Sequence, residues 1–472
     1  MPGNYDKERY YMAFGKKRLP TPKEEKLPFF KFLAWKSSDV ASAAAFLIVN
    51  TYLMRFCTDF LGMNPVTVGN ILLVSNIFDF ITDFIGAIIV DNTNTKIGRG
   101  RPYELSIVGV TICTILLFAT PAGWSNAVKV AWVFSVYTFE FGVFNTLRGA
   151  GQNAYTIRAW KNRKVIGKLS SYGGFVTTLG SMCISLTFPT MMAKMATTAE
   201  GWLPLVGMYM LPLTLISTLR FIFVKEDTSI DAGNHVKVDV KAIFNMMKKN
   251  KYAWLYAGII FLFNTIQSLG TLSYYWRYVV GDESMSGIIS IFGTLMLPLM
   301  LIFPIILKKF NASQIIGASA FVSAAGYLLT FFAKDSIPML LVSGIFSAFA
   351  MLPISYLGYL IIMDLASYNR HLDMPSMEAS IGAIFNGFGS QMGQGFGGWL
   401  TGFILSAAGY VAATGNEVVQ QPESVIMAIR CLHALLPMLL MVLIAVCGFA
   451  LSKLSKQMPE IEAKLAEKDA VK

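Results

Sequence analysis

The chain has 472 residues, of which 54% are hydrophobic and 14% are charged, and its formal net charge is +11. Soluble domains carry about a quarter charged residues, so this composition, with a mean hydropathy of +0.54, argues against a soluble enzyme built from ordinary domains. The five cysteines lie in or beside apolar segments without a CxxC pair or a metal-binding spacing. They therefore predict neither a disulfide framework nor a zinc site.

The apolar residues are gathered in long segments, each able to cross a hydrocarbon core about 30 Å thick. We expect twelve membrane spans, at residues 37–57, 66–90, 104–122, 127–155, 169–193, 202–224, 252–280, 286–307, 312–333, 337–363, 379–410 and 425–452. The polar, basic segment 1–36 lacks the cleavage site of a signal peptide. We interpret it as a cytoplasmic tail, with a helix at the membrane surface near 29–35.

Lys and Arg are distributed unequally between the two sides of these spans. Most of them fall on the side that holds both termini, whereas the opposite loops carry only Lys129, Lys194 and Lys334. Because basic loops stay on the cytoplasmic side, we expect both termini to be cytoplasmic and the protein to lie in the plasma membrane. The net positive charge follows from this bias, so it does not indicate nucleic-acid binding.

A Lys-rich central segment divides the chain into two halves of six spans each. The predicted parts are an N-terminal tail (1–36), a first bundle (37–224), a central cytoplasmic loop (225–251), a second bundle (252–452) and a C-terminal tail (453–472). An all-α membrane protein with this layout is typical of a two-bundle secondary transporter. The three histidines are far apart in the sequence and no Gly-rich phosphate loop is present, so we do not expect an enzyme.

The densest group of polar residues inside a span lies in the second span. Asn76, Asp79, Asp83 and Gly86 share one helix face, and Thr82 lies beside them. Two carboxylates one turn apart can converge on a small cation, with Thr82 as a third oxygen ligand. Because buried carboxylates also repel each other, the pair could instead bind a proton. The alternative is that the pair faces a wet crevice and binds a structural partner.

The residues around this pair resemble a known family of transporters. The run Asp79-Phe-Ile-Thr-Asp83 and the loop 91–103, with its Gly-Arg-Gly-Arg-Pro segment, are similar to the signature of the glycoside–pentoside–hexuronide cation symporters. The stretches 52–62 and 396–402 are similar to the family's first and eleventh spans, so the resemblance covers both halves. It implies a major-facilitator fold, with twelve helices in two six-helix bundles, and sugar uptake coupled to sodium ions or protons.

The resemblance also implies roles for particular residues. Asp79 and Asp83 match the family's cation-site carboxylates, and Asp39 is similar to its acidic sugar ligand in span one. Alternatively, Asp39 and the two serines before it cap the start of a helix. Three family charges are absent: Gln391 stands in place of a lysine, Asn76 in place of an arginine of the best-known member, and Asn145 near an acidic sugar ligand. A non-sugar amphiphile or organic anion therefore remains an alternative cargo.

Span four contains Glu140 and Arg148, which could replace these missing charges. Asn145, Arg148 and Gln152 share a helix face that suits hydroxylated or anionic substrates. Arg148 either reaches Asp83 and lines the pathway, or its long stem carries the charge to the membrane surface.

Further candidates lie in the loop after span two and in the second bundle. We expect Asp91, Arg99 and Arg101 to form a cytoplasmic gate that binds carbonyl ends and acidic groups of neighbouring helices. Asn264, Gln267, Tyr356 and Gln391 are candidate substrate ligands. The glycines between 387 and 402 favour close helix packing over ligand binding.

The sequence thus predicts a secondary active transporter that couples a sugar or glycoside to H⁺ or Na⁺ by alternating access. We expect no cofactor apart from the coupling ion, and proton coupling is slightly favoured because desolvated carboxylates without a fixed cation tend to be neutralised. The expected partners are a small-molecule substrate and the lipid bilayer, without nucleic acid, and the protein is expected to be a monomer. A non-transporting membrane sensor is the second alternative; it would need no carboxylate pair facing a cavity.

Overall fold

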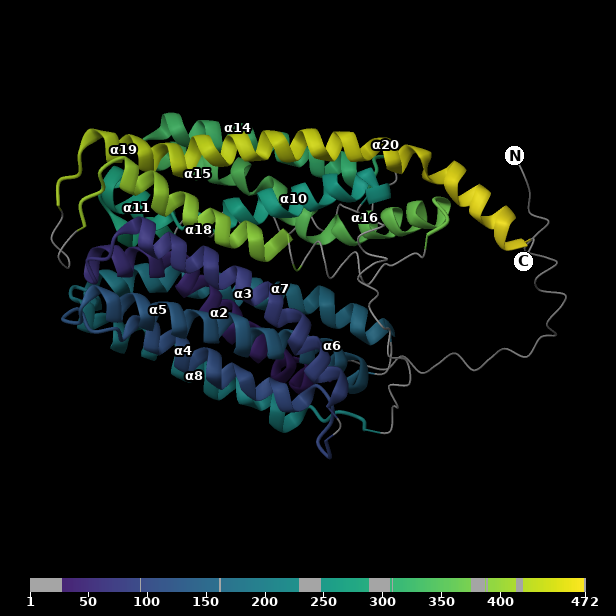
Figure 1. Cartoon of the computed structure of the whole chain (residues 1–472), viewed down its shortest axis with the longest axis horizontal. Helices are drawn as coiled ribbons and strands as arrows, with labels where there is room; N and C mark the ends of the chain where they lie inside the picture. Colours follow the sequence, from purple (N-terminus) through teal and green to yellow (C-terminus); the bar gives the residue numbers. More distant parts are fainter. Residues whose placement is uncertain are drawn as a thin grey trace.

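The computed structural model describes residues 28–93, 95–160, 163–228, 248–287, 306–307, 309–374, 387, 389–412 and 419–470. Within these ranges the structure is helical, and its only β-type pairing is an isolated bridge between Thr95 and Gly98. Two bundles of long helices lie side by side (Figure 1). The first bundle contains the helices up to α8, and the second contains α10 to α20.

The helices of the first bundle follow the apolar segments of the sequence. They are α2 (Phe29–Arg55) with the π-helix η1 (Phe56–Phe60), α3 (Pro65–Asn92), η2 (Arg101–Leu105) with α4 (Ser106–Phe118), α5 (Asn126–Phe139) with the π-helix η3 (Glu140–Asn145) and α6 (Thr146–Ala159), α7 (Arg163–Met195), and η4 (Ala199–Gly201) with α8 (Trp202–Phe223). The start of α3 is fixed by Asn64, whose side chain accepts a hydrogen bond from the N–H of Val66, and by Pro65 in the first turn.

The second bundle is described in part. Its helices are α10 (Lys251–Gln267), α11 (Leu272–Tyr275) with η5 (Trp276–Val280), η6 (Glu283–Gly287), α14 (Ala312–Ala333), α15 (Ile337–Ser347) with η7 (Ala348–Ala350) and α16 (Met351–His371), α18 (Gly389–Ala407), and α19 (Glu423–Arg430) with η9 (Cys431–Leu435) and α20 (Leu436–Ala470). Most of the span expected at 286–307 and the start of that expected at 379–410 lie outside the described residues.

Nine helices in the described ranges are long and apolar enough to cross a membrane. The pair Lys251–Gln267 and Leu272–Val280, bent by 41°, makes a tenth if it is taken as one span. The expected twelve spans are therefore accounted for only in part. The Gly-rich helix α18 does not reach the same apolarity, because glycine, serine and glutamine fill much of it.

Helix α2 begins earlier than the sequence analysis expected. It starts at Phe29, with Pro28 as its N-cap residue, so residues 29–35 form the first turns of a span helix and not a separate surface helix. Asp39 lies several turns inside this helix. The interpretation of Asp39 as a helix cap is therefore wrong, and its carboxylate is available for contacts with other helices.

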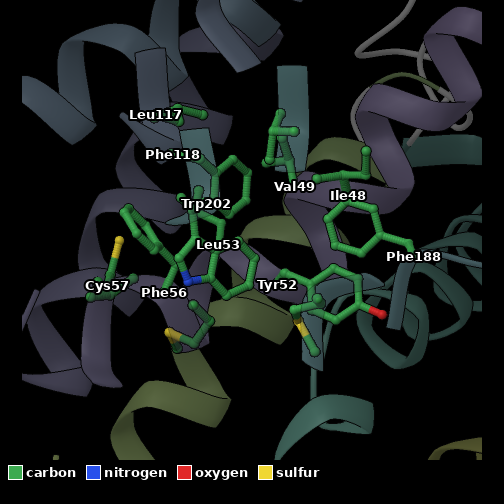
Figure 2. Close-up of a cluster of buried hydrophobic side chains, with 14 of the residues drawn as sticks. Ile48, Val49, Tyr52, Leu53, Phe56, Cys57, Leu117, Phe118, Phe188 and Trp202 are labelled. Carbon is green, nitrogen blue, oxygen red and sulfur yellow. The ribbon is translucent and has the colours of Figure 1, made fainter. Parts of the chain in front are cut away.

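Buried aromatic side chains hold α2 against the rest of the first bundle. Figure 2 shows Trp202 of α8 stacked on Phe118 of α4, with ring centroids 5.3 Å apart, and Phe56 beside both rings. Tyr52 packs on Phe188 of α7 at 4.9 Å. Because aromatic side chains bury large areas and interlock in fixed orientations, this cluster sets the position of α2 relative to three other helices.

The glycines of α18 allow two helices to approach it closely. A Cβ atom on Gly402 would lie 2.2 Å from the carbonyl oxygen of Pro65 in α3, and one on Gly397 would lie 2.5 Å from that of Thr265 in α10. Only glycine fits at such contacts between helix backbones. The prediction that this glycine run serves helix packing is confirmed, and within the described residues its α3 side forms an extensive contact between the bundles.

Side-chain hydrogen bonds join the bundles at one end of the molecule. We refer to the end where α2 begins and α20 finishes as the terminal end, and to the opposite end as the far end (Figure 1). At the far end, Arg55 binds Ser273 at 2.9 Å and forms an ion pair with Glu283. Asp59 accepts hydrogen bonds from Tyr278, at 3.3 Å, and Tyr410. These residues, the far-end network, tie the first bundle to the second.

Candidate functional site

Two carboxylates of α3 meet a hydroxyl group from span four. The Oγ1 atom of Thr146, the first residue of α6, lies 3.0 Å from Oδ1 of Asp79 and 2.9 Å from Oδ1 of Asp83. Asp79 is buried, and Asp83 is partly buried. The spacing of one helical turn places both carboxylates on one face, as the sequence predicts. Thr146 directly follows the π-helix η3.

Thr82 is not the hydroxyl that joins the pair. Its Oγ1 donates to the main-chain carbonyl of Asp79, at 3.0 Å, within the same helix. Thr146, which the sequence analysis missed, supplies the hydroxyl beside Asp79 and Asp83 that was expected from Thr82. Nothing in the local spacing of α3 could reveal Thr146, because it lies more than sixty residues away and reaches the pair only through tertiary packing.

Hydrogen-bond counting indicates that the pair needs another positive partner. The hydroxyl of Thr146 has one hydrogen, but two carboxylate oxygens and the carbonyl of Phe141, at 3.2 Å, lie within reach. Within the described ranges, neither carboxylate has an ion pair with Lys or Arg. Two charges with a single donor hydrogen between them are costly in a membrane interior, so a bound proton or small cation would stabilise this arrangement.

Gln391 connects this pair to the second bundle. Its side chain, on α18, lies near the carboxylate of Asp83 on α3. The sequence analysis listed Gln391 as a substrate ligand in the place of a family lysine. The structure instead places Gln391 near the carboxylate pair. A change in the charge of Asp83 therefore acts on a residue of the second bundle.

Asn76 lies on the same face of α3 but turns toward its own bundle. Its Nδ2 donates to the carbonyl of Leu72 at 2.7 Å and, at 3.5 Å, to the hydroxyl of Tyr137. Next to it, Tyr137, Asn50, Ser268 and other residues enclose a cavity of about 20 Å³ between the bundles. Small-molecule sites usually measure about 300–1,000 Å³, so this space is too small for a sugar in the present conformation.

Glu140 does not face the space between the bundles. It is fully buried inside the first bundle, where Oε1 lies 2.8 Å from the hydroxyl of Thr114 on α4. Its Oε2 has no hydrogen-bond partner among the described residues. Its position between η3 and α4 argues against the predicted role as a substrate ligand, because cargo between the bundles would not meet it.

Arg148 belongs to a group of five charged residues in the terminal half of the first bundle. We name this group the charge cluster; its members come from α2, η2, α6 and α8, and they are Lys36, Asp39, Glu104, Arg148 and Arg220. Nη2 of Arg148 lies 3.2 Å from Oδ1 of Asp39 and 3.2 Å from Oγ of Ser38. Arg148 is 7% exposed. It therefore does not reach the membrane surface, and its partner is Asp39 and not Asp83.

Arg220 forms the buried back of the charge cluster. Its Nη1 lies 3.0 Å from Asp39, its Nε lies 3.2 Å from Oε2 of Glu104, and its guanidinium stacks 3.7 Å from the ring of Trp35. The sequence analysis did not include Lys36, Glu104 or Arg220 among the site residues. Arg220 could have been recognised from the sequence, because it is an isolated charge inside an apolar segment.

The loop after α3 is built around a residue that the sequence analysis also missed. Glu226, just beyond α8, accepts hydrogen bonds from the N–H groups of Arg99, Gly100 and Arg101, at 3.0, 3.0 and 2.9 Å. Arg101 donates to the carbonyl of Phe221 near the end of α8, at 2.6 Å. Of the predicted gate residues, Arg101 binds a carbonyl at a helix end through its side chain, and Arg99 and Arg101 bind the acidic Glu226 through their main chains. The side chain of Asp91 lies outside the described parts.

The remaining predicted ligands are distributed between the two bundles. Gln152 donates to Asp39 at 3.3 Å, next to Arg148, and Asn145 is partly buried at the end of η3. Asn264 accepts a hydrogen bond from Ser390 at 3.0 Å, and the side chain of Gln267 is exposed. The side chain of Tyr356 is outside the described residues.

Comparison with known proteins identifies the family. The sequence pattern of the MFS/sugar transport proteins matches residues 35–452, which is most of the chain. The chain belongs to this family. The family resemblance and the major-facilitator fold predicted from the sequence are therefore confirmed, and the protein is a membrane-embedded secondary active transporter.

Individual relatives are distant but extend along most of the chain. The isoprimeverose transporter of Lactiplantibacillus pentosus is 25% identical over 402 residues, which are 82% of each chain. The glucuronide carrier protein homolog of Escherichia coli (strain K12) is 23% identical and covers 90% of this chain and 91% of its own. Among solved structures, the nucleoside transporter NupG has a TM-score of 0.60 at 14% identity, covering 90% of this chain and 99% of its own. This last likeness concerns the fold alone.

Proposed function

We propose that the protein moves a sugar or glycoside across the plasma membrane together with a cation, H⁺ or Na⁺, that binds at Asp79 and Asp83. The observation that carries the proposal is the shared hydroxyl of Thr146 between two carboxylates that lack an ion pair in the described part of the chain. Relatives named for isoprimeverose and glucuronide transport support the cargo class.

The contact of Gln391 with Asp83 supplies a route from ion binding to movement. A proton or cation at the pair changes the charge of Asp83, which lies on α3 near Gln391 of α18 in the other bundle. The relative stability of different bundle arrangements then depends on ion occupancy, as coupled transport requires. Since Thr146 has one hydrogen for two carboxylates, a shared proton is the simplest occupant.

The excess of Lys and Arg in the loops at the terminal end supports a cytoplasmic position for that end. In that orientation the far-end network joins the two bundles on the outer side, and the charge cluster lies in the cytoplasmic half of the first bundle.

An ion-gradient experiment tests this function. Purified full-length protein in liposomes is offered labelled isoprimeverose and methyl glucuronide, with either an inward pH gradient or an inward sodium gradient. We expect at least one sugar to accumulate only while one of the two gradients lasts. Asp79→Asn and Asp83→Asn should abolish accumulation but allow exchange of cargo at equal concentrations on both sides.

Asp364→Asn is the matched control, because Asp364 is a partly buried carboxylate of the second bundle that accepts a hydrogen bond from Ser455. It should keep gradient-driven accumulation. Full accumulation by both Asp79→Asn and Asp83→Asn would show that the coupling ion binds elsewhere.

A further inference from the structure

Glu140 is a fully buried carboxyl group without a charged partner. Its side chain is 0% exposed, and its Oε2 has no hydrogen-bond partner in the described part of the chain. Among the described residues, no lysine or arginine forms an ion pair with it. A carboxylate inside a membrane protein is costly unless a cation or several donors compensate its charge. This position therefore favours the neutral acid over the carboxylate.

The hydroxyl group of Thr114 indicates where the proton of this acid lies. Its Oγ1 is 2.8 Å from Oε1 of Glu140 and 2.9 Å from the main-chain carbonyl oxygen of Val110, one turn earlier in α4. A hydroxyl has one hydrogen to donate and can also accept, whereas a carbonyl can only accept. Both contacts are hydrogen bonds if Thr114 donates to Val110 and accepts from a protonated Glu140. An ionised Glu140 would instead compete with Val110 for a single hydrogen.

The neighbouring helices do not supply a positive charge for Glu140. The π-helix η3, which begins at Glu140, packs on α3, α4, α5 and α6. Cys113 of α4 and Tyr137 of α5 lie near Glu140, and both residue types are uncharged at neutral pH. Lys129 of α5 binds a main-chain carbonyl at the far end, and Arg148 of α6 belongs to the charge cluster. The titratable groups of α3 on this side are the carboxylate pair itself, so the described helices offer no counter-charge.

Glu140 and the proposed ion site lie on opposite faces of η3. Glu140 faces α4, where it meets Thr114. Gly142 faces α3, because a Cβ atom added to it would lie 3.8 Å from the Cα of Asp79. Thr146 directly follows η3 and lies 3.0 Å from Oδ1 of Asp79. The hydrogen bond at Glu140 therefore holds η3 on α4 from the side opposite the carboxylate pair.

We propose that Glu140 is a second proton-binding site, which holds its proton in this conformation and donates it in a hydrogen bond to Thr114. Glu140 thereby acts as a positioning residue for Thr146, since it anchors η3 on α4 and η3 leads directly into Thr146. Loss of the proton would leave a buried charge and remove the donated hydrogen bond, so the geometry of the ion site would loosen. This proton is distinct from the coupling ion at the carboxylate pair, and the inference thus goes beyond the proposed function.

Infrared spectroscopy of the purified full-length protein tests the proton directly. The spectrum of Glu140→Gln is subtracted from that of wild type at neutral pH. We expect the difference to contain the carbonyl stretching band of a protonated carboxyl group and to lack carboxylate bands. Glu200→Gln makes the same change at an exposed glutamate, so it is the matched control and should remove carboxylate bands instead.

Variants at the same contact test the positioning role through the affinity for the coupling ion, measured as ion-dependent uptake into liposomes. Glu140→Gln keeps an uncharged hydrogen-bond donor for Thr114 and should retain the wild-type affinity. Glu140→Met has a similar length without a donor, and Thr114→Val removes the acceptor. Both should lower the affinity about tenfold, as expected when the hydroxyl of Thr146 no longer reaches the charged pair.

Each outcome supports or overturns a named part of the inference. Carboxylate bands in the Glu140 difference spectrum, or a protonated band that disappears when sodium is added, would overturn the proton site. Wild-type ion affinity in Glu140→Met and Thr114→Val would overturn the positioning role. Low affinity in Glu140→Gln would show that the site needs a negative charge and not a neutral acid. The infrared result stands without any transport measurement, so failure of the proposed symport would not be confused with failure of the proton site.

Discussion

Thr146 sets the geometry of the proposed ion site, although it carries no charge. Its hydroxyl lies within hydrogen-bond distance of Asp79 and Asp83, which belong to another helix. A single oxygen between two carboxylates holds them close together and orients one oxygen atom of each toward the same point. The affinity of the site for its ion should therefore depend on this hydroxyl as well as on the two acids.

Thr146→Val replaces the hydroxyl by a methyl group of similar size. We expect the affinity for the coupling ion to fall about tenfold or more, since hydrogen bonds to charged groups contribute about 1.5–3 kcal/mol. Ion-dependent uptake at increasing ion concentrations measures this change.

Thr138→Val is the matched control for this substitution. Thr138 lies in the same span, and its hydroxyl forms a hydrogen bond with Ser75, at 2.9 Å, and not with the acids. Thr146→Ser should retain most of the affinity. Equal ion affinity in wild type and Thr146→Val would show that the hydroxyl is not part of the site.

Arg220 has a structural role in the charge cluster. It is fully buried, stacks on Trp35 and pairs with both carboxylates of the cluster. We expect Arg220→Ala to lower the free energy of unfolding by about 3–5 kcal/mol, because buried oxygens of Asp39 and Glu104 would lose their ion-pair partner and a cavity would form beside Trp35. Arg220→Lys should recover only part of this loss, since lysine lacks the planar fork.

Unfolding of the detergent-solubilised protein by heat measures the effect of the Arg220 substitutions. Arg277→Ala is not a suitable control because Arg277 is also buried. Lys194→Ala changes an exposed lysine and should leave the thermal stability unchanged. An Arg220→Ala protein as stable as wild type would contradict the described packing.

At the scale of the helices, the contact between α3 and α18 depends on glycine. The backbones approach so closely at Gly402 that a Cβ atom there would collide with the carbonyl of Pro65. The obstacle is main chain, which cannot rotate away as a side chain can. Any substitution at this position must move α3 and α18 apart. Asp83 lies on α3 and Gln391 on α18, so the distance between these two residues would also increase.

Gly402→Ala should lower stability by about 1–3 kcal/mol, as overpacked positions do, and should reduce coupled transport more than the same change elsewhere. Gly258→Ala is the matched control, because the nearest atom to its added Cβ would lie 4.0 Å away. Thermal unfolding and gradient-driven uptake are the measurements. Identical behaviour of the two variants would rule out a special role for this helix contact.

The helices also show which features a single sequence can reveal. The pair Asp79 and Asp83 was predictable because a one-turn spacing is a local property of α3. The start of α2 was missed because Lys31 and Lys36 lower the hydropathy of its first turns, although Phe32, Ala34 and Trp35 are buried there. The partners of Arg148 come from helices distant in the sequence, so only the tertiary fold determines which acid pairs with which arginine.

At the scale of the whole molecule, the far-end network stabilises one arrangement of the bundles. The hydroxyl groups of Tyr278 and Tyr410, from the second bundle, both donate to Asp59 of the first. Because Asp59 is buried, these hydrogen bonds must break if the far end opens. The strength of these hydrogen bonds therefore contributes to the equilibrium between the arrangement closed at the far end and the arrangement open at the far end.

Tyr410→Phe removes one of these hydrogen bonds without changing the ring. We expect the population open at the far end to increase about tenfold or more relative to the closed one, since the lost bond involves a charged acceptor. Spin labels at Ser125 and Asp282, both exposed, report the far-end distance by pulsed electron resonance.

Tyr275→Phe is the control for the same chemical change. The hydroxyl of Tyr275 binds main-chain carbonyls of Thr330 and Lys334 within the second bundle, so its loss should leave the distance distribution unchanged. If the distance distribution between the labels is the same in Tyr410→Phe and wild type, the hydrogen bonds of the far-end network do not contribute to the free energy of opening.

The continuity of α2 and η1 has a mechanical consequence. Asp39 and Arg55 lie on one unbroken helix, about 24 Å apart along its axis at 1.5 Å per residue. The aromatic cluster packs against this helix at Tyr52. Tyr52 lies about 20 Å from Asp39 and about 5 Å from Arg55 along the helix axis. Because α2 is continuous between these positions, a rigid-body tilt of α2 would move Asp39 and Arg55 together, and it would alter the charge cluster and the far-end network in a single step.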